Sequence, residues 1–524
     1  MSFNFSWAVE MYLSGAWVDV SADVRSVAPI VLSRGIDGSG ITDRVAKVGT
    51  LSFALNNATS NSAATLGYYS PDNANVRTGF GLGTKTRLKI YEVLYYVDGE
   101  AIADEDGVSI TDESDSVLVT DGGWCRYDTG HCKFYGKISD ITPKAGALKE
   151  RYVSVQCVDY MNELLTHNMT GIAVQVNKTP NQLFGTIVGN LPVAPLAISY
   201  GTDAGPFPYA LHDVQDERTS GMNALQRVMQ TALYWSYIKA DTTYGETLVI
   251  EGRSDRSAIA STATFANSMR ELTVNQKQDI IYNTIRGVGY PTQIGTTDEV
   301  LWKSRTEIPL TASQNLIVTA RFIDPTGGGN RVALYPGTGV GPAANPDVDF
   351  KMSSVAGDGG NDQNANLTIA VTWYGNTAAI SLTNAAGATR YVNLLQLRGH
   401  IIRLYDAAES VKTDDASKLI YGDRTLAIAF PYRSEVWWLG SLVTNLLAQY
   451  KDPRSQIDNL EFIANANDTL MTAAMACDVG SKITLSETVT GFSADDYIVS
   501  SYDLILEPGK LTCKLGNLAM PTYY

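Results

Sequence analysis

The chain has 524 residues, of which 44% are hydrophobic and 18% are charged, so it is long enough for several folded domains and too apolar for extended disorder. Its 40 basic and 55 acidic residues give a net charge of −15, which argues against a nucleic-acid-binding protein, since those carry clustered Lys and Arg. The opening MSFNFSWAVEMYL has no basic segment followed by an apolar run. No stretch reaches the roughly 20 apolar residues that span a bilayer, so we expect a chain made in the host cytoplasm without a membrane span.

Residues 1–165 contain several runs in which apolar and polar residues alternate, the period of a strand with one buried face. A Gly- and Asn-rich stretch at 56–83 separates two of the runs and is long enough to indicate a contact loop. We predict a first β-barrel domain here. Its alternating runs are 8–13, 17–20, 49–55, 86–93, 133–138 and 151–160.

An acidic insertion at about 98–123 (DGEAIADEDGVSITDESDSVLVTDGG) interrupts this first domain. Two short β runs inside it predict a projecting hairpin. Its acids lack the spacing of a calcium-binding loop, which has acidic or amide side chains at alternate positions and a Glu at its end.

The five cysteines are an odd number and do not form the spacing of a disulfide framework. Cys125 and Cys132 have six residues between them, with His131 directly before Cys132, and Cys157 follows in the next β run. This spacing matches no common zinc motif, and cross-strand neighbours in a hairpin would produce it equally well. Whether Cys125, Cys132 and Cys157 share a metal or a disulfide stays open at this point.

Residues 166–260 change character and predict a small α+β domain. Thr179 followed by Pro180 is typical of a helix start, and a second helix is expected from Ser220. The second helix runs into a hairpin formed by 234–240 and 247–251. The side chains expected on the buried faces of the two helices are Leu183, Phe184, Ile187, Val188 and Leu191, and Met222, Leu225, Val228, Met229 and Leu233.

Residues 261–524 return to β patterns and predict a second β-barrel domain, beginning with a strand at 280–288. A β-sandwich-like unit is expected as an insertion at about 305–400, because several alternating runs there are divided by Gly, Asn and Asp turns. A helical segment at about 435–478 contains two helices, 435–450 and 468–477, and strands close the chain. The fold class is therefore mainly β with a small α+β domain.

The motifs of common enzymes are missing from the sequence. The four histidines, His131, His167, His212 and His400, form no zinc-binding spacing, and there is no nucleophile elbow or phosphate-binding loop. We therefore predict no catalytic, cofactor-binding or metal-binding residues and no enzyme. A carboxylate pair for glycoside hydrolysis depends on the fold and cannot be read from spacing. Trp373 and Tyr374 could stack on sugars, although packing in a sheet is the more common use of such residues.

Several short segments along most of the chain form a recognisable order: 17–21 (WVDVS), 34–36 (RGI), 49–57 (GTLSFALNN), 134–138 (FYGKI), 249–253 (VIEGR), 281–283 (IYN), 380–384 (ISLTN), 397–399 (LRG) and 450–453 (YKDP). Together they resemble the minor tail and baseplate hub proteins of long-tailed bacteriophages. The resemblance implies two tail-tube-like β-barrel portions in one chain and no catalytic residues. The acidic hairpin and the unit at 305–400 depart from that pattern.

The resemblance implies a structural component of the virion at the tail tip, a hub or baseplate ring subunit that joins the tail tube to the tip and lines the DNA channel. Its expected partners are copies of itself, with a trimer preferred over a hexamer, and other tail proteins such as the tube, the distal tail and fibre or spike proteins. DNA would pass without specific binding. The alternatives are a glycan-binding adhesin that uses residues 305–400 and a cell-wall hydrolase.

Overall fold

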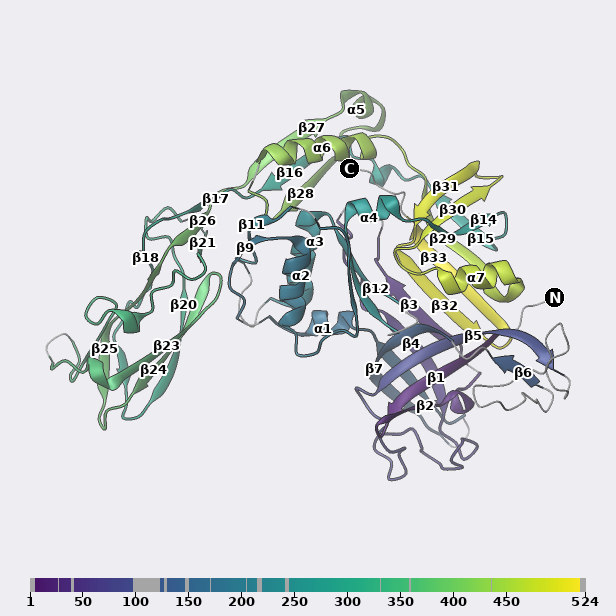
Figure 1. The fold of residues 1–524 in the computed structure, drawn as a ribbon, viewed down its shortest axis with the longest axis horizontal. Helices are drawn as coiled ribbons and strands as arrows, with labels where there is room; N and C mark the ends of the chain where they lie inside the picture. Colours follow the sequence, from purple (N-terminus) through teal and green to yellow (C-terminus); the bar gives the residue numbers. More distant parts are fainter. Residues whose placement is uncertain are drawn as a thin grey trace, which may run out of the picture.

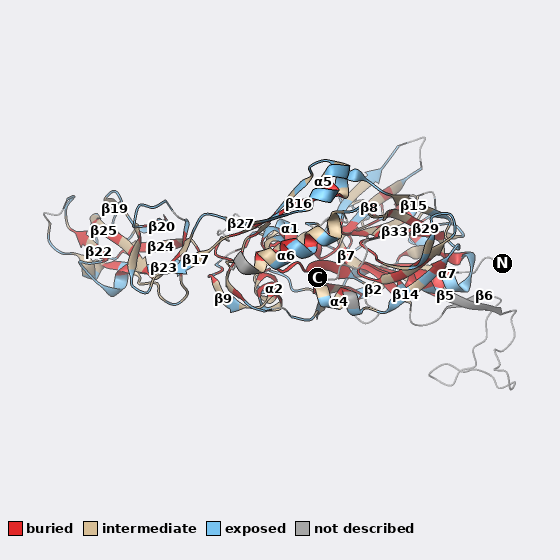
Figure 2. Ribbon diagram, turned by 90° about the horizontal axis from the view of Figure 1, so that it is seen from above, coloured by how far each residue is buried: buried red, intermediate tan, exposed pale blue. Residues whose placement is uncertain are grey.

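The computed structural model describes residues 5–518 except 27, 39–41, 98–122, 127–129, 147–149, 170, 204, 214–218, 241–244, 330, 358–359 and 435. The chain is mainly β, as the sequence predicted, with several sheets and a few helices (Figure 1). Viewed from above it is elongated, with one β unit at the far end from the largest sheet (Figure 2). The predicted acidic hairpin at 98–123 lies almost entirely outside the described residues.

The largest sheet has 12 strands and combines strands from the first and the last part of the chain. In hydrogen-bonded order it runs β15-β29-β33-β32-β3-β4-β8-β7-β5-β1-β2, with β6 paired to β5. The strands from the first part of the chain are β1 (Phe5–Leu13), β2 (Ala16–Asp19), β3 (Ile30–Gly35), β4 (Thr50–Asn56), β5 (Lys85–Val97), β6 (Gly123–Arg126), β7 (His131–Lys144) and β8 (Tyr152–Val158). Those from the last part are β15 (Glu271–Asn275), β29 (Gln456–Ile463), β32 (Ser501–Glu507) and β33 (Lys510–Leu518).

The two parts of this sheet meet where β3 pairs antiparallel with β32, from Ile30 opposite Leu506 to Gly35 opposite Ser501. Strands of residues 1–165 and of residues 261–524 therefore share one sheet and one hydrophobic core, which also takes in the helices between them. Periodicity in the sequence shows which face of a strand is buried and does not show which strand it pairs with. The division of the chain into these domains stays a prediction.

The α+β region contains the two predicted helices, which are confirmed. Helix α2 (Pro180–Gly189) begins with a capping box in which Thr179 and Gln182 bond each other's backbone N–H groups. Helix α3 (Gly221–Ala232) is capped by Ser220, whose hydroxyl accepts from the Asn223 N–H. All ten side chains predicted to point inward are buried.

The other elements of this region frame the two helices. Strand β12 (Trp235–Lys239) forms the predicted antiparallel hairpin with β13 (Thr247–Glu251), and β10 (Ile198–Tyr200) adds to β13 in parallel. A small sheet pairs β9 (Gln175–Lys178) with β11 (Phe207–Ala210). Two short helices that the sequence analysis did not predict, α1 (Met161–Thr166) and α4 (Arg253–Ala258), lie at the start and near the end of this region.

A small layer connects this region to the outlying unit. Helix α6 (Val436–Tyr450) covers the sheet of β27 (Ala408–Thr413), β16 (Thr284–Gly289) and β28 (Thr425–Phe430), and the short helix α5 (Asp415–Tyr421) follows β27. The strand predicted at 280–288 is wrong at its start, because Gln278–Ile280 form a 3-10 turn and β16 begins only at Thr284. The buried Asn283 amide donates to the Gly422 carbonyl and accepts from the Arg424 N–H. The alternation of apolar and polar residues does not predict these hydrogen bonds.

The outlying unit, called here the insert, consists of β17 to β26 and lies at one end of the molecule (Figures 1 and 2). It has a hydrophobic core of its own, with Leu301, Ile380 and Leu397 among the fully buried residues. Its strands begin before residue 305 and end after residue 400. They are β17 (Thr292–Ile294), β18 (Glu299–Lys303), β19 (Ile308–Leu310), β20 (Asn315–Arg321), β21 (Arg331–Leu334), β22 (Phe350–Ser353), β23 (Leu367–Trp373), β24 (Thr377–Asn384), β25 (Arg390–Gly399) and β26 (Ile401–Leu404).

The last part of the chain packs beside the large sheet. Helix α7 (Asp468–Ala476) confirms the second predicted helix of the 435–478 segment, as α6 confirms the first. A three-stranded sheet of β14 (Ser261–Ala266), β30 (Lys482–Glu487) and β31 (Phe492–Ile498) lies next to α7. The loop between α7 and β30 contains Asp478. Its carboxylate contacts Arg34 of the first β-rich part and Ala240 of the α+β region.

Candidate functional site: a buried charged junction

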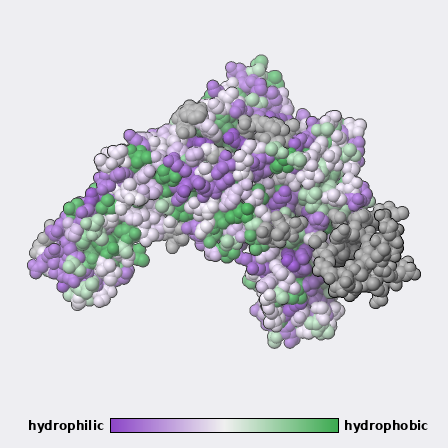
Figure 3. All heavy atoms as spheres, viewed as in Figure 1, coloured by the Kyte–Doolittle hydropathy of each residue, from purple (hydrophilic) through white to green (hydrophobic). Residues whose placement is uncertain are grey.

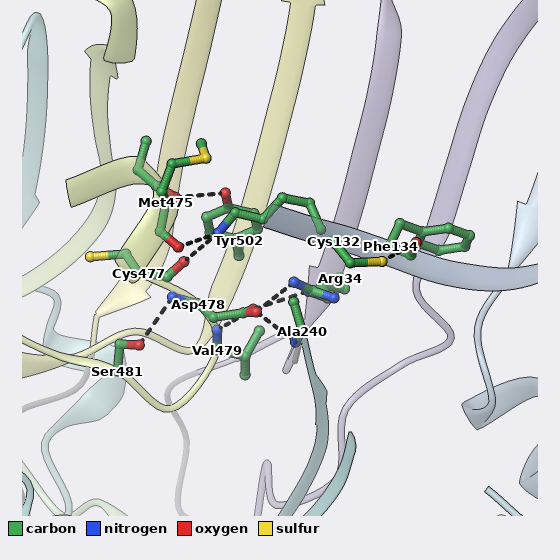
Figure 4. Close-up of polar contacts among 12 residues, drawn as sticks. Arg34, Cys132, Phe134, Ala240, Met475, Cys477, Asp478, Val479, Ser481 and Tyr502 are labelled. Carbon is green, nitrogen blue, oxygen red and sulfur yellow. Dashed lines mark hydrogen bonds and ion pairs between the residues drawn. The ribbon is translucent and has the colours of Figure 1, made fainter. Parts of the chain in front are cut away.

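A buried ion pair joins residues near the two ends of the chain. The Arg34 guanidinium, on β3, donates from Nε to Asp478 Oδ1 at 3.0 Å and from Nη2 to Asp478 Oδ2 at 2.5 Å (Figure 4). Each side chain is only 3% exposed. Two parallel hydrogen bonds fix the carboxylate in the plane of the guanidinium, the strongest geometry that such a pair adopts.

The Asp478 carboxylate also holds the α+β region. It accepts from the Ala240 N–H, directly after β12, at 2.8 Å and from the Val479 N–H at 2.7 Å. The Asp478 N–H in turn donates to the Ser481 hydroxyl at 3.0 Å. One carboxylate therefore connects the first β segment, the α+β region and the last part of the chain (Figure 4).

A lysine is buried beside this pair. Lys133 of β7 is 2% exposed, and its ammonium donates to the Met475 carbonyl at 2.7 Å and reaches the Cys477 carbonyl at 3.5 Å. It also lies 5.3 Å from the centre of the Tyr502 ring. Burial lowers the pKa of Lys133, an effect that the nearby Asp478 opposes. Carbonyls at the C-terminal end of α7 supply the acceptors that a buried ammonium needs.

Tyr502 of β32 completes what we call the buried junction: Arg34, Lys133, Asp478 and Tyr502. The Tyr502 hydroxyl donates to the Ala474 carbonyl at 3.1 Å, and the Arg34 guanidinium lies 5.6 Å from its ring centre. These groups come from β3, β7, β32 and the loop after α7. The junction is enclosed by protein, so it can position segments and cannot meet a substrate.

Two buried carboxyl groups lie at the neighbouring seam between β8 and β13. Asp159 Oδ1 accepts from the Met161 N–H at 3.0 Å, and Glu246 Oε1 accepts from the Tyr160 N–H at 2.8 Å. Burial raises the pKa of Asp159 to about 7 and, with a contribution from Asp159, the pKa of Glu246 to about 8. Two acids this close disfavour simultaneous ionisation.

The described cysteines are free, buried thiols. Cys132 lies opposite Lys89, whereas Cys157 lies opposite Ile138, six residues further along β7. At about 3.3 Å per residue this separates the two thiols by about 20 Å, too far for a shared metal or a disulfide. Burial raises the pKa of Cys132 to about 11 and that of Cys157 to about 12, so neither is a reactive thiolate. The side chain of Cys125, in β6, is outside the described part.

No group of three or more His, Cys, Asp or Glu side chains that could hold a metal occurs among the described residues. The described part of the chain also contains no helix with the length and hydropathy needed to cross a membrane. Trp373 is half-buried and packs at 6.4 Å from the Phe322 ring, and a Cβ on Gly339 would meet it at 2.7 Å. Tyr374 lies next to Gly171 of the α+β region. Trp373 and Tyr374 are both half-buried, and Trp373 takes part in the packing of the insert.

A cavity of about 500 Å³ lies where the insert meets the α+β region. We call it the hinge cavity. A small cluster formed by Val174, Ala333 and Ile402 buries the contact between the two parts. His212 of the α+β region and Asn376 of the insert both line the cavity. Sequence analysis did not group these residues, because they lie more than 160 positions apart in the chain.

No family model matches the chain, and no curated protein matches it. Among solved structures, the chain is similar to the 43 kDa tail protein of prophage MuSo2 from Shewanella oneidensis, with 8% identity, coverage of 99% of each chain and a TM-score of 0.47. It is also similar to the tail protein from Neisseria meningitidis MC58, with 8% identity, coverage of 99% of this chain and 98% of that chain, and a TM-score of 0.48.

Proposed function

We propose that the chain is a structural subunit of a bacteriophage tail tip, a hub or baseplate ring component that joins the tail tube to the tip and lines the DNA channel. The observation that carries the proposal is the 12-stranded sheet, built from strands of the first and the last part of the chain. In the described residues its two terminal strands, β2 and β15, are each paired on one side only. A sheet with free edges invites pairing with other chains unless a defined neighbour covers those edges.

The edge at β2 has the composition of a protein interface. Tyr12 and Trp17 are cross-strand partners in the β1–β2 hairpin, with ring centres 5.5 Å apart. Tyr12 is 40% exposed, and Trp17 stacks under the Arg87 guanidinium at 4.2 Å. Aromatic and arginine side chains are enriched in the parts of interfaces that contribute most to binding. On the face shown in Figure 3, hydrophobic residues are otherwise interspersed with hydrophilic ones.

The buried junction suits a mechanical role. Because Arg34, Lys133 and Asp478 tie three parts of the chain inside protein, a displacement of one part is passed on to the others. The insert, with its own core, projects from this body and is free to contact further tail proteins or a receptor. The mechanism of such a subunit is to seal the channel, let DNA pass and transmit a signal by rearranging contacts.

A closed homo-oligomer is part of the proposal, with three subunits preferred because two β-rich blocks occur in one chain. Native mass spectrometry and negative-stain imaging of the purified chain, alone and with neighbouring tail proteins, test it. Tyr12→Asp should dissociate the oligomer, because it places a charge at the β1–β2 edge. Leu419→Asp, at a 90% exposed site on α5, is the matched control and should leave the oligomer intact. A monomer at micromolar concentration under all these conditions would refute the proposal.

The channel wall should be acidic or neutral, so that DNA slides through. The net charge of −15 motivates this expectation, although only groups within about 10 Å of the bore act on DNA at physiological salt. A wall rich in Lys and Arg would hold duplex DNA through counterion release. The assembled oligomer should therefore bind duplex DNA weakly at low salt. Tight binding that weakens steeply as salt is added would contradict a neutral or acidic bore.

A further inference from the structure

The insert is joined to the body of the chain by two short links (Figure 1). On the body side, β16 and β27 are paired as far as Gly289 and Ala408. Within the insert, β17 and β26 pair again in the same antiparallel sense. Residues 290–291 and 405–407 are therefore the only covalent connections between the two parts. Links of this length, at the ends of strands, are where a rigid unit turns as on a hinge.

The two links lie side by side. The Tyr405 N–H donates to the Pro291 carbonyl at 3.0 Å, and the Tyr290 N–H donates to the Arg433 carbonyl of the body at 2.9 Å. The link at 405–407 is exposed to solvent. None of the link residues, all of which the structure describes, belongs to a hydrophobic core. A rotation about the links therefore leaves the packing of both parts intact.

A small apolar contact, called here the latch, holds the insert against the α+β region. It consists of Val174 of the α+β region and Ala333 and Ile402 of the insert, all of them buried. Tyr209 and Tyr335 meet across the same contact, with ring centres 6.5 Å apart. The latch is a separate cluster from the core of the insert, so its contacts can break without unfolding either part.

The docked position leaves two polar atoms enclosed at this contact. Nδ1 of His212, in the α+β region, and Oδ1 of Asn376, in the insert, have no hydrogen-bond partner among the described residues. An enclosed polar atom without a partner destabilises the state that encloses it, because the atom loses its hydrogen bonds to water. Burial of the latch favours docking, whereas these two atoms oppose it. The docked position is therefore only weakly favoured.

The two parts also approach each other through a position without a side chain. Gly375 lies in the turn between β23 and β24, and a Cβ there would come within 3.0 Å of the His212 carbonyl oxygen. The next nearest atoms are also those of the His212 backbone, at 3.3 Å. A side chain at Gly375 would therefore press on the α+β region and act as a wedge between the two parts.

We propose that the insert is an arm with two positions, docked as in this structure and open, in which it has turned about the links and the latch is broken. Opening lets water reach the enclosed atoms of His212 and Asn376. It also uncovers the latch and the rings of Tyr209 and Tyr335, an apolar and aromatic surface of the kind that protein interfaces use. A partner that contacts this surface would hold the arm open, because it binds one position and not the other. The inference does not rest on the proposed place of the chain in a tail.

Distance measurements between two spin labels on the full chain test the proposal. The labels are attached to p-acetylphenylalanine introduced at two exposed positions, Asn223 on α3 and Thr319 on β20, so the native cysteines stay unchanged. The parent chain should show one main distance, with about a tenth of the molecules or fewer at a second distance. Gly375→Val should raise the ratio of open to docked molecules about ten-fold or more, because its side chain overpacks the docked contact. Gly375 does not have a left-handed backbone, so the substitution adds no backbone strain.

Gly387→Val is the matched control, because Gly387 lies in another turn of the insert and a Cβ there would meet nothing within 4 Å. It should leave the distances unchanged. Adding Asn376→Leu to Gly375→Val should return part of the population to the docked distance, because it removes one enclosed polar atom. Circular dichroism should show that every variant folds, and Gly375→Ala replaces Gly375→Val if that variant does not. The proposal is overturned if the wedge variant has the distances of the parent chain. It is also overturned if Gly387→Val opens the arm equally, or if Asn376→Leu increases the open fraction further.

Discussion

Replacing Asp478 by Ala should be among the most destabilising single substitutions in the chain. The change leaves the Arg34 guanidinium buried without its carboxylate and removes the acceptor for the Ala240 and Val479 N–H groups. Breaking a buried ion pair by removing one partner costs about 3–5 kcal/mol, most of it from the charge left unpaired. Lys133 adds to this cost, since it lies in the same buried junction and loses the nearby negative charge.

Equilibrium unfolding in urea, followed by intrinsic fluorescence and by circular dichroism, measures this loss. A chain of this size unfolds in more than one transition, so hydrogen exchange should locate the effect in β3, β32 and the loop after α7. Glu507→Ala is the control, because Glu507 pairs with Lys510 at 3.3 Å with both side chains well exposed. Exposed pairs contribute only about 0–1 kcal/mol.

A double variant separates the charge from the packing. Arg34→Met with Asp478→Leu removes both charges and should be more stable than either single charge deletion, because apolar replacements of a whole buried pair are often tolerated. If Asp478→Ala unfolds within about 1 kcal/mol of the parent chain, the junction does not hold the three parts together. The mechanical role that we assign to it would then be wrong.

Three further predictions concern the seam, the carboxyl pair and the insert. Gly35→Ala should separate β3 from β32, because Gly35 has φ +132° and a Cβ would overlap the Ser500 carbonyl. The backbone amides that pair β3 with β32 should then lose protection in hydrogen exchange. Asp159 and Glu246 have pKa values of about 7 and 8 in the folded chain, above the ordinary 3.8 and 4.5. Folding therefore takes up protons, so the stability that these groups contribute is complete below about pH 4 and is lost as pH rises to 8. In Glu246→Gln, the free energy of unfolding, measured in urea at several pH values, should fall less steeply as the pH rises. An unchanged pH dependence would contradict the raised pKa of Glu246. Replacing residues 290–407 by a short turn should leave the unfolding of the large sheet unchanged, because β16 and β27 are antiparallel neighbours whose ends this turn can join. General loss of circular dichroism would show that the insert belongs to the main core.

Local signals in the sequence were sufficient for most helices and strands. The hydroxyl of Thr179 before Pro180 and the hydroxyl of Ser220 each predicted a helix start that the structure confirms, because capping acts within four residues. Alternation likewise located β4, β8 and β24, since each strand has one buried face. It failed at residues 280–283, where a side chain bonds to a distant backbone segment.

The candidate sites depend on the tertiary structure. A Lys in an alternating run is ordinarily expected to face water, yet Lys133 is buried because carbonyls more than 340 positions later in the chain accept its hydrogen bonds. The pairing of β3 with β32 and the bond from Arg34 to Asp478 join residues more than 440 positions apart. Periodicity records how strongly a face is buried and carries no information about what covers it. The partner is chosen by packing across the whole chain, and only the folded structure contains that choice.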